Sequence, residues 1–194
     1  MAHINQKPSK FMYNLLHTVP PFSEGRPDVV NAVVEIVSGS INKYELITES
    51  GQLKLDRVGY SSLGYPFTYG AIPQTWDEDN DPLDIMIVKV TEPIVPGALV
   101  EARVIGIMKF EDGGEVDDKI IAVLSEDKRC DDIQSLDDLS DHTKKEIIHF
   151  WEYYKHLKKP GTSVTKGFFD KEEALKVIAT CDERYKQEYA PKLS

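Results

Sequence analysis

The stretch that decides the architecture of this chain is Asp79-Asn80-Asp81-Pro82-Leu83-Asp84, followed by Ile85-Met86-Ile87-Val88-Lys89-Val90. The second half is an apolar run typical of a β-strand, so the three aspartates are predicted to lie on a stiff loop and at the mouth of that strand. Asp77 and Glu78 add two further negative charges. Because neighbouring like charges disfavour ionisation, such a cluster favours bound cations. Hard divalent ions with oxygen ligands, Mg²⁺ above all, are predicted here.

The acidic stretch allows two other interpretations. An acidic turn between strands is often only a solvated loop. A calcium-binding EF-hand would place Asp77, Asp79 and Asp81 at positions 1, 3 and 5 of its loop. It would then need a glycine where Pro82 stands and a bidentate glutamate where Val88 stands, so the EF-hand interpretation fails at both positions.

Length and composition are those of one globular domain. The chain has 194 residues, of which 41% are hydrophobic and 29% charged, and this is long enough to bury a core without disulfides. Cys130 and Cys181 match no zinc or redox spacing, which suggests buried or neutral thiols in a reducing compartment. We expect neither secretion nor a membrane span. The cytoplasm is therefore the expected location. A formal net charge of −10 argues against a nucleic-acid partner, because that affinity depends on clustered cations.

The predicted elements run from strands to helices within one domain, residues 1–194, that begins with an N-terminal arm, residues 1–28. Strands are predicted at 31–38 and 42–48, as a hairpin, and at 52–59, 85–90, 98–110 and 120–124. Segment 61–73, rich in Gly, Pro and aromatic residues, is expected to be irregular. This order indicates an α+β fold, an antiparallel barrel or sheet followed by two helices.

The two helices are predicted from apolar residues at helical spacing. The first covers 141–158 and ends before Pro160-Gly161, with the buried stripe Ile147, Ile148, Trp151, Tyr154 and Leu157. The second begins at Asp170, with Glu173 as its capping-box partner, and its buried stripe is Ala174, Leu175, Ile178 and Cys181.

Charged residues on the first strands could share a site with the acidic loop. Lys43 and Glu45 are two residues apart, so they face the same side of a strand, and Glu35 lies on the strand before. A solvent-exposed sheet face would explain them equally well.

Phosphate-binding groups come next along the chain. The guanidinium of Arg57 is a planar fork suited to a phosphate, and the hydroxyls of Tyr65 and Tyr69 can donate to phosphate oxygens. The two tyrosines could instead be core aromatic residues in a tight turn. A second acidic turn, Asp112-Gly113-Gly114-Glu115-Val116-Asp117-Asp118-Lys119, could converge with the first at one end of a barrel. It could also be an ordinary hairpin turn.

Several short motifs stand in a fixed order along the chain. They are Glu35 after Val33-Val34, Lys43-Tyr44-Glu45, Asp56-Arg57, Tyr65-Pro66 with Tyr69-Gly70, the Asp79-Asp81-Pro82-Asp84-Ile85 pattern, Asp112 with Asp117 and Lys119, and Tyr154-Lys155. In this order and at these intervals the chain resembles the soluble family I inorganic pyrophosphatases, from Glu35 to about Lys155 and more loosely to its end. The D-x-D-P-x-D pattern is the signature of that family.

The resemblance implies a mainly antiparallel five-stranded OB-type β-barrel flanked by two α-helices. It implies Mg²⁺-dependent hydrolysis of pyrophosphate to two phosphates, by metal-activated water and in-line attack, with several ions per site and Mn²⁺ or Co²⁺ as possible substitutes. It also implies a homo-oligomer, hexameric if the bacterial pattern holds.

The resemblance also implies roles for individual residues. Asp81 would accept a proton from the nucleophilic water, and Tyr65 would support the site by hydrogen bonding. The metal ligands would be Asp79, Asp84, Asp112, Asp117, Glu35 and Glu45. The phosphate ligands would be Lys43, Arg57, Tyr69, Lys119, Tyr154 and Lys155. The chain departs from the family at 159–164, where the lysine and tryptophan of a G-K-W-V stretch are missing.

Two rival functions use the same residues. A non-catalytic module that binds metal and phosphate needs the carboxylates but has no use for Asp81 as a base. An OB-type nucleic-acid binder would need a basic groove with stacking aromatic side chains, against which the acidic balance of the chain argues.

Overall fold

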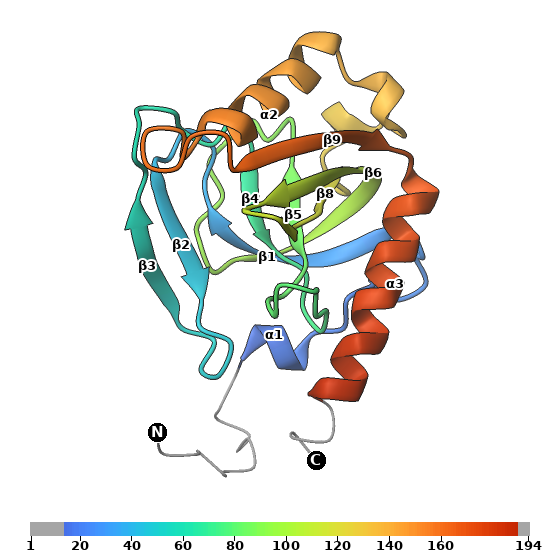
Figure 1. The fold of residues 1–194 in the computed structure, drawn as a ribbon. Coiled ribbons are helices and arrows are strands. Elements are labelled where there is room, and N and C mark those ends of the chain that lie inside the picture. The colour runs from blue at the N-terminus through green and yellow to red at the C-terminus, as the bar shows by residue number, and fades with distance from the viewer. Residues whose placement is uncertain (1–13, 190–194) are drawn as a thin grey trace.

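The structure, a computed structural model, describes residues 14–189 as a large mixed sheet, a two-stranded sheet and three α-helices (Figure 1). The strands are β1 Val29–Ile36, β2 Asn42–Leu46, β3 Leu53–Val58, β4 Thr68–Ala71, β5 Asp84–Ile87, β6 Leu99–Asp112, β7 Glu115–Val116, β8 Lys119–Leu124 and β9 Ser163–Phe169. The helices are α1 Leu15–Thr18, α2 Asp141–Tyr153 and α3 Lys171–Glu188, with 3₁₀ turns η1 Lys128–Cys130 and η2 Leu136–Asp138.

The parallel pairing of β5 with β8 brings two distant acidic segments together. Asp84, the first residue of β5, lies opposite Lys119, the first residue of β8, and the register continues to Ile87 opposite Ala122. Parallel strands begin at the same edge of a sheet. The acidic loop before β5 and the acidic turn before β8 therefore end side by side.

The pairing of the large sheet returns to its starting strand. β1 pairs with β4, β4 with β5, β5 with β8 and β8 with β6, and β6 pairs again with β1, with Val29 opposite Arg103. Within this path only the β5–β8 pairing is parallel. With β7 and β9 added on β6, the sheet has seven strands. The mixed sheet with few helices confirms the predicted α+β class.

The predicted hairpin of residues 31–38 and 42–48 is wrong. β1 is buried along its whole length, and its two edges are occupied by β4 and β6. β2 has no free edge of β1 to join, and it pairs with β3 instead. This two-stranded sheet stands to one side of the large sheet (Figure 1).

The helices cover apolar side chains that alternate along the strands. On β5, Met86 belongs to the cluster that includes Ile147 and Trp151 of α2, whereas Ile85 packs in the cluster that includes Ile178 of α3. This alternation is expected for a strand buried on both faces. Burying each such side chain contributes about 1.5–3 kcal/mol, so both helices are fixed firmly against the sheet.

The helix predictions are confirmed in type and corrected in detail. Leu157, predicted in the buried stripe, is 73% exposed, and the Glu173 carboxylate pairs with Lys109 rather than closing the predicted capping box. α3 begins after Asp170, whose carboxylate accepts from the Glu173 N–H at 2.9 Å. The first helix was predicted to run to residue 158 but ends at Tyr153, after which the chain turns so that Lys155 pairs with Asp112. Strand β9 is absent from the predicted elements, because it pairs with β6, which is distant in the sequence.

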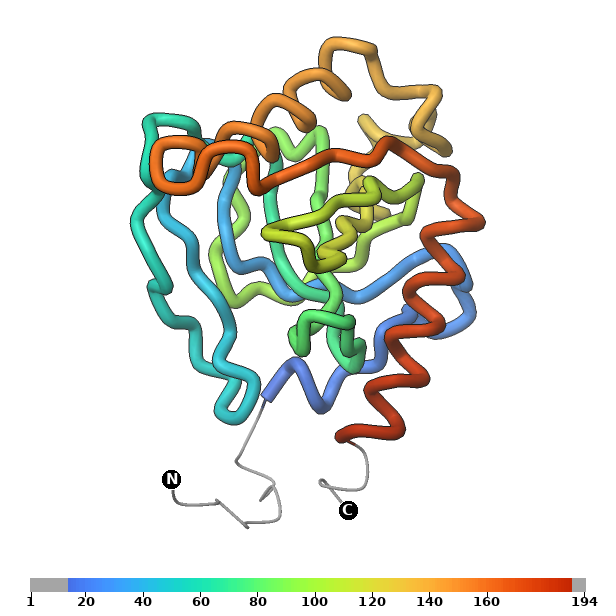
Figure 2. Tube along the Cα trace, in the orientation of Figure 1, coloured from blue at the N-terminus to red at the C-terminus, as the bar shows by residue number. Residues whose placement is uncertain are grey.

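The predicted arm, residues 1–28, falls partly outside the described residues, which begin at residue 14. In the described part, Leu16 of α1 is 2% exposed, and its carbonyl accepts from the Gln74 N–H at 2.9 Å. Figure 2 shows this blue segment beside the green loop between β4 and β5. The segment therefore packs on the back of the loop that carries the three aspartates.

The ring of His17 joins this segment to α3 and to the turn between β2 and β3. The Thr48 carbonyl can only accept, so Nε2 of His17 donates to it at 2.8 Å. Nδ1 then accepts from the Tyr185 hydroxyl at 2.7 Å. Burial lowers the pKa of His17 below its ordinary 6.5, against the opposing effects of the Thr48 carbonyl and Glu49.

We expect Gly70→Ala to lower the free energy of unfolding by about 3 kcal/mol, at the upper end of overpacking costs. A Cβ at position 70 would lie 2.1 Å from the Val33 carbonyl oxygen, and backbone of a paired strand cannot rotate away. Urea denaturation of both proteins measures the difference, and a loss below about 1 kcal/mol would contradict the close packing of β1 on β4.

We expect acidification to destabilise the wild type more than His17→Phe. The folded-state pKa of His17 lies below its unfolded value, so its contribution is present above about pH 6.5 and is lost as the pH falls through the folded pKa. Urea denaturation at about pH 7.5 and about pH 5.5 compares the two proteins. Equal losses in both proteins would remove His17 from the pH dependence.

Candidate active site

The loop between β4 and β5 has a backbone held by its own acidic residues. The Asp77 N–H donates to the Asp81 carbonyl at 2.8 Å, and the Asp81 N–H donates to the Asp79 carboxylate at 3.1 Å. Asn80 has a φ of 66°, which an asparagine tolerates better than most residues. These bonds and Pro82 fix the turn that leads into β5, as the sequence predicted for a stiff loop.

A cavity of about 230 Å³ opens where this loop meets the starts of β5 and β8. It collects residues from β1, β2, β3, β4, α2 and both acidic segments. All but one of the sequence-predicted site residues line it, namely Glu35, Lys43, Glu45, Arg57, Tyr65, Tyr69, Asp79, Asp81, Asp84, Asp112, Asp117, Lys119 and Tyr154. The remaining one, Lys155, forms an ion pair with Asp112 of that lining.

Lys119 is the most buried charge of the cavity. Its side chain is 1% exposed, and its ammonium donates to the carboxylates of Asp84 and Asp117. Burial disfavours the charged form, but the two carboxylates outweigh it and raise the pKa of Lys119 above its ordinary value. Lys119 is therefore a permanent cation at the floor of the site.

Four carboxylates of the cavity ionise less readily than in water, among them Asp117, whose pKa burial raises. Burial, reinforced by the charge of Asp84, raises the pKa of Asp79 and of Asp81 to about 7. Burial raises the pKa of Glu35 to about 8, although the Leu46 N–H donates to it at 2.8 Å. These carboxylates lack enough positive charge from the chain itself, so the cavity favours additional cations.

Further cationic and hydroxyl groups lie around the carboxylates. Lys43 forms an ion pair with Glu45 on the same face of β2. The Tyr154 hydroxyl donates to Asp112 at 3.3 Å. Burial raises the pKa of the Tyr65 hydroxyl well above its ordinary value, so it stays protonated and can donate. The cavity thus holds both acidic oxygen ligands and donors suited to phosphate.

Trp151 is a wall of the cavity that sequence reasoning treated only as a core residue. The Lys119 ammonium lies 5.0 Å from the centre of its ring, and its indole N–H donates to the Met86 sulfur at 3.1 Å. The electron-rich face of a tryptophan stabilises a nearby cation. Trp151 lies three residues before Tyr154 and so shares a helical face with it. This spacing is the feature of the sequence that indicates that the two side chains line the same site.

The donor set suits a hard divalent cation. Oxygen atoms of carboxylates are the protein ligands that Mg²⁺ prefers. Among residues 14–189, no group of three or more acidic, histidine or cysteine side chains is already arranged to hold a metal. Lys119 instead holds Asp84 and Asp117, and Lys155 holds Asp112. Metal binding would require these carboxylates to turn from the lysines toward the ion.

Known proteins with similar sequences are inorganic pyrophosphatases. A sequence model described as inorganic pyrophosphatase matches residues 32–186. The inorganic pyrophosphatase of Halalkalibacterium halodurans is 46% identical over 160 residues, which cover 82% of this chain and 97% of that protein. The one from Thermus thermophilus is 44% identical over 168 residues, covering 86% and 95%.

Solved structures agree with the sequences. The inorganic pyrophosphatase of Neisseria gonorrhoeae superposes with a TM-score of 0.83 at 39% identity, covering 89% of this chain and 99% of that one. The Thermus thermophilus structure gives a TM-score of 0.83 at 41% identity, covering 90% and 99%. Both likenesses cover most of this chain and almost all of the other one, and the chain belongs to the inorganic pyrophosphatase family.

Proposed function

We propose that this chain hydrolyses inorganic pyrophosphate to two phosphates and uses Mg²⁺ as its cofactor. The observation that carries the proposal is the meeting of both acidic segments with lysine, arginine and tyrosine donors in one cavity. The name of the family, inorganic pyrophosphatase, specifies the same substrate. Metal dependence is general in this family, and the oxygen-rich lining supports Mg²⁺ in particular.

The proposed metal ligands are the carboxylates on the two acidic segments and on β1 and β2. They are Asp79, Asp84, Asp112, Asp117, Glu35 and Glu45. When bound, the ions would neutralise the charge of pyrophosphate and lower the pKa of the attacking water. Mn²⁺ and Co²⁺, which accept similar ligands, are proposed as substitutes.

Asp81 is proposed as the proton acceptor. Its pKa of about 7, raised first by burial and then by neighbouring acids, suits a group that must take up a proton near neutral pH. The oxygen of water bonds to one phosphorus while the bridging P–O bond on the opposite side breaks. A carboxylate oxygen of Asp81 takes the proton that the water loses.

The donors of the cavity are proposed to hold the two phosphates. They are Lys43, Arg57, Tyr69, Lys119, Tyr154 and Lys155. Lysine and arginine charges stabilise negative charge spread over the phosphate oxygens during displacement. Lys119 and Lys155 are paired with carboxylates here, and both would be released toward phosphate if those carboxylates held metal ions. Tyr65 supports this group by hydrogen bonding.

The finer features of the protein are proposals as well. We propose that residues 1–194 form one domain and that the closed path of β1, β4, β5, β8 and β6 is an OB-type barrel. The return of β6 to β1 supports this. Among the described residues, no helix is long and apolar enough to cross a membrane. A homo-oligomer, hexameric in the bacterial pattern, a cytoplasmic location and the absence of a nucleic-acid partner remain predictions.

Phosphate release from pyrophosphate tests the proposal directly. We expect rapid release with Mg²⁺, loss of release with excess chelator, and far slower release from ATP or a phosphomonoester, because the cavity of about 230 Å³ suits a small, highly charged anion. Folded protein that binds Mg²⁺ without releasing phosphate would instead favour a metal- and phosphate-binding module.

We expect Asp84→Asn and Asp81→Asn both to lower turnover but to differ in their effect on Mg²⁺ binding. Asp84→Asn removes a proposed metal ligand, so turnover should fall by a factor of about 100 or more at any Mg²⁺ concentration. Asp81→Asn removes the proposed proton acceptor, so turnover should fall by about 100-fold or more while Mg²⁺ binding stays near the wild type.

Steady-state kinetics and calorimetric Mg²⁺ titration separate the two variants. Glu111→Gln is a suitable control, because Glu111 pairs on the protein surface with Lys166 at 2.9 Å. Full activity of Asp84→Asn at saturating Mg²⁺ would remove that residue from the mechanism.

A further inference from the structure

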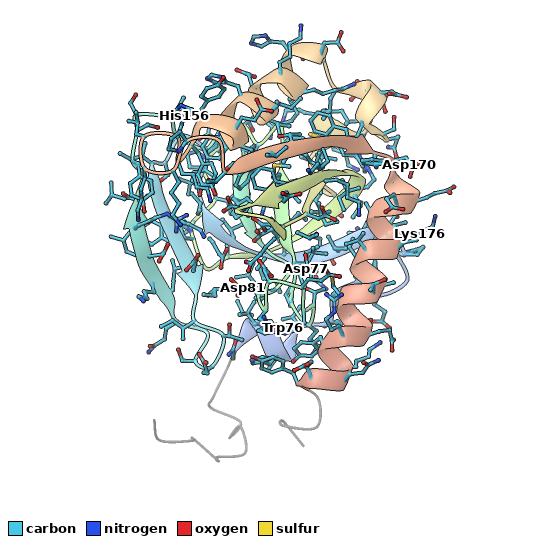
Figure 3. All side chains as sticks on the ribbon, viewed as in Figure 1. Trp76, Asp77, Asp81, His156, Asp170 and Lys176 are labelled. Atoms are coloured by element: carbon cyan, nitrogen blue, oxygen red, sulfur yellow. The ribbon has the colours of Figure 1, made fainter. Side chains whose placement is uncertain are left out.

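The acidic loop has two sides with different partners. Asp79 and Asp81 line the cavity, whereas Asp77 is 8% exposed and lies against α3. Figure 3 shows Asp77 beside the lower half of α3 and Asp81 farther from that helix. The part of the loop that holds the proposed catalytic groups is thus supported from behind by a helix outside the cavity.

One guanidinium on α3 contacts three consecutive residues of the loop. Nη1 of Arg184 donates to the Trp76 carbonyl at 3.0 Å and to the Asp77 carboxylate at 3.3 Å. Nη2 donates to the Glu78 carboxylate at 3.3 Å. The contact to the Trp76 carbonyl acts on the backbone itself, so Arg184 does more than balance the charge of two acids.

The same stretch of α3 contacts the loop through Cys181. The Trp76 N–H donates to the Cys181 carbonyl at 2.9 Å, and the Cys181 thiol donates to the Asp77 carboxylate at 3.6 Å. Cys181 itself is 1% exposed. Both main-chain polar groups of Trp76, its N–H and its carbonyl, are therefore held by α3, and the Asp77 side chain next to them is largely buried.

Asp77 passes this support on to the catalytic part of the loop. Its N–H donates to the Asp81 carbonyl at 2.8 Å, and its carbonyl accepts from the Asn80 N–H at 3.2 Å. Its carboxylate also accepts from the Glu78 N–H at 2.8 Å. A shift of Asp77 would therefore displace the main chain at Asn80 and Asp81, to which it is hydrogen-bonded.

We propose that Arg184 is a positioning residue for the reaction. Its guanidinium holds residues 76–78 on α3 and thereby sets the direction in which Asp79 and Asp81 enter the cavity. The inference rests on the proposed function for its effect on turnover, but its effect on metal affinity stands separately. Residues that orient metal ligands commonly contribute about 10-fold to 100-fold in metal affinity or activity.

A lysine at this position could not replace the arginine fully. A single ammonium reaches one or two acceptors, whereas the planar guanidinium presents two nitrogens toward three acceptors at once. Arg184→Lys keeps the charge and loses the fork. Arg184→Gln loses both, so the two variants form a graded series.

The test measures the Mg²⁺ dependence of pyrophosphate hydrolysis and Mg²⁺ binding by calorimetry, on the full chain. The matched control is Lys176→Gln on the same helix, since Lys176 has an exposed side chain (Figure 3). We expect Arg184→Gln to raise the Mg²⁺ concentration for half-maximal rate by about tenfold or more and to lower kcat. Arg184→Lys should lie between that variant and the wild type, and Lys176→Gln should match the wild type.

The outcomes separate positioning from stability alone. A lowered Tm of Arg184→Gln with unchanged Mg²⁺ dependence would overturn the proposal, and so would an equal shift in Lys176→Gln. If Arg184→Gln does not fold, Arg184→Lys decides by the same measurement. If the wild type itself does not hydrolyse pyrophosphate, the proposed function fails, while the calorimetric comparison still decides whether Arg184 supports metal binding.

Discussion

The rest of the site depends on the parallel pairing that sets Asp84 of β5 opposite Lys119 of β8. A lysine with a 1% exposed side chain needs compensating charge, and the pairing supplies it from Asp84 on one strand and Asp117 on the turn before the other. The two acidic segments, about 30 residues apart in the sequence, therefore meet at a point fixed by main-chain hydrogen bonds. Every other group of the cavity is arranged around this contact.

The charge balance of the cavity explains why an acidic chain can accept a highly charged anion. Carboxylates that are buried together without enough counter-charge have raised pKa values, as Asp79 and Glu35 do. Lysines from β2, β8 and the segment after α2 offset part of this charge. Divalent ions at the proposed ligands would complete the balance and exceed it, because each would bring two positive charges to a lining that already holds lysine and arginine. The cavity would then attract phosphate.

The residues that line the cavity were largely predictable as a group because they lie in short motifs, whereas the pairing of the strands was not. Asp79, Asp84 and Lys119 are each marked by a neighbouring turn and an apolar strand, which are local features of the sequence. The partner of a strand is not local. Nothing in residues 31–48 shows that both edges of β1 are taken by β4 and β6, or that β9 will find β6. Trp151 carries a double role for the same reason, since its apolar spacing indicates a core position and only the fold places its ring beside Lys119.

The length of β6 has a consequence for how the molecule forms. This strand of 14 residues pairs with β1, β7, β8 and β9, so its partners come from both halves of the chain. Contacts between distant segments slow folding, because a large loop must close before they form. β9 follows β6 in the chain, so the part of β6 that pairs with β9 has no strand partner there until β9 has been made. An open edge is a template for pairing with other chains, so the pairing of β9 with β6 covers a surface at which incomplete chains would otherwise associate.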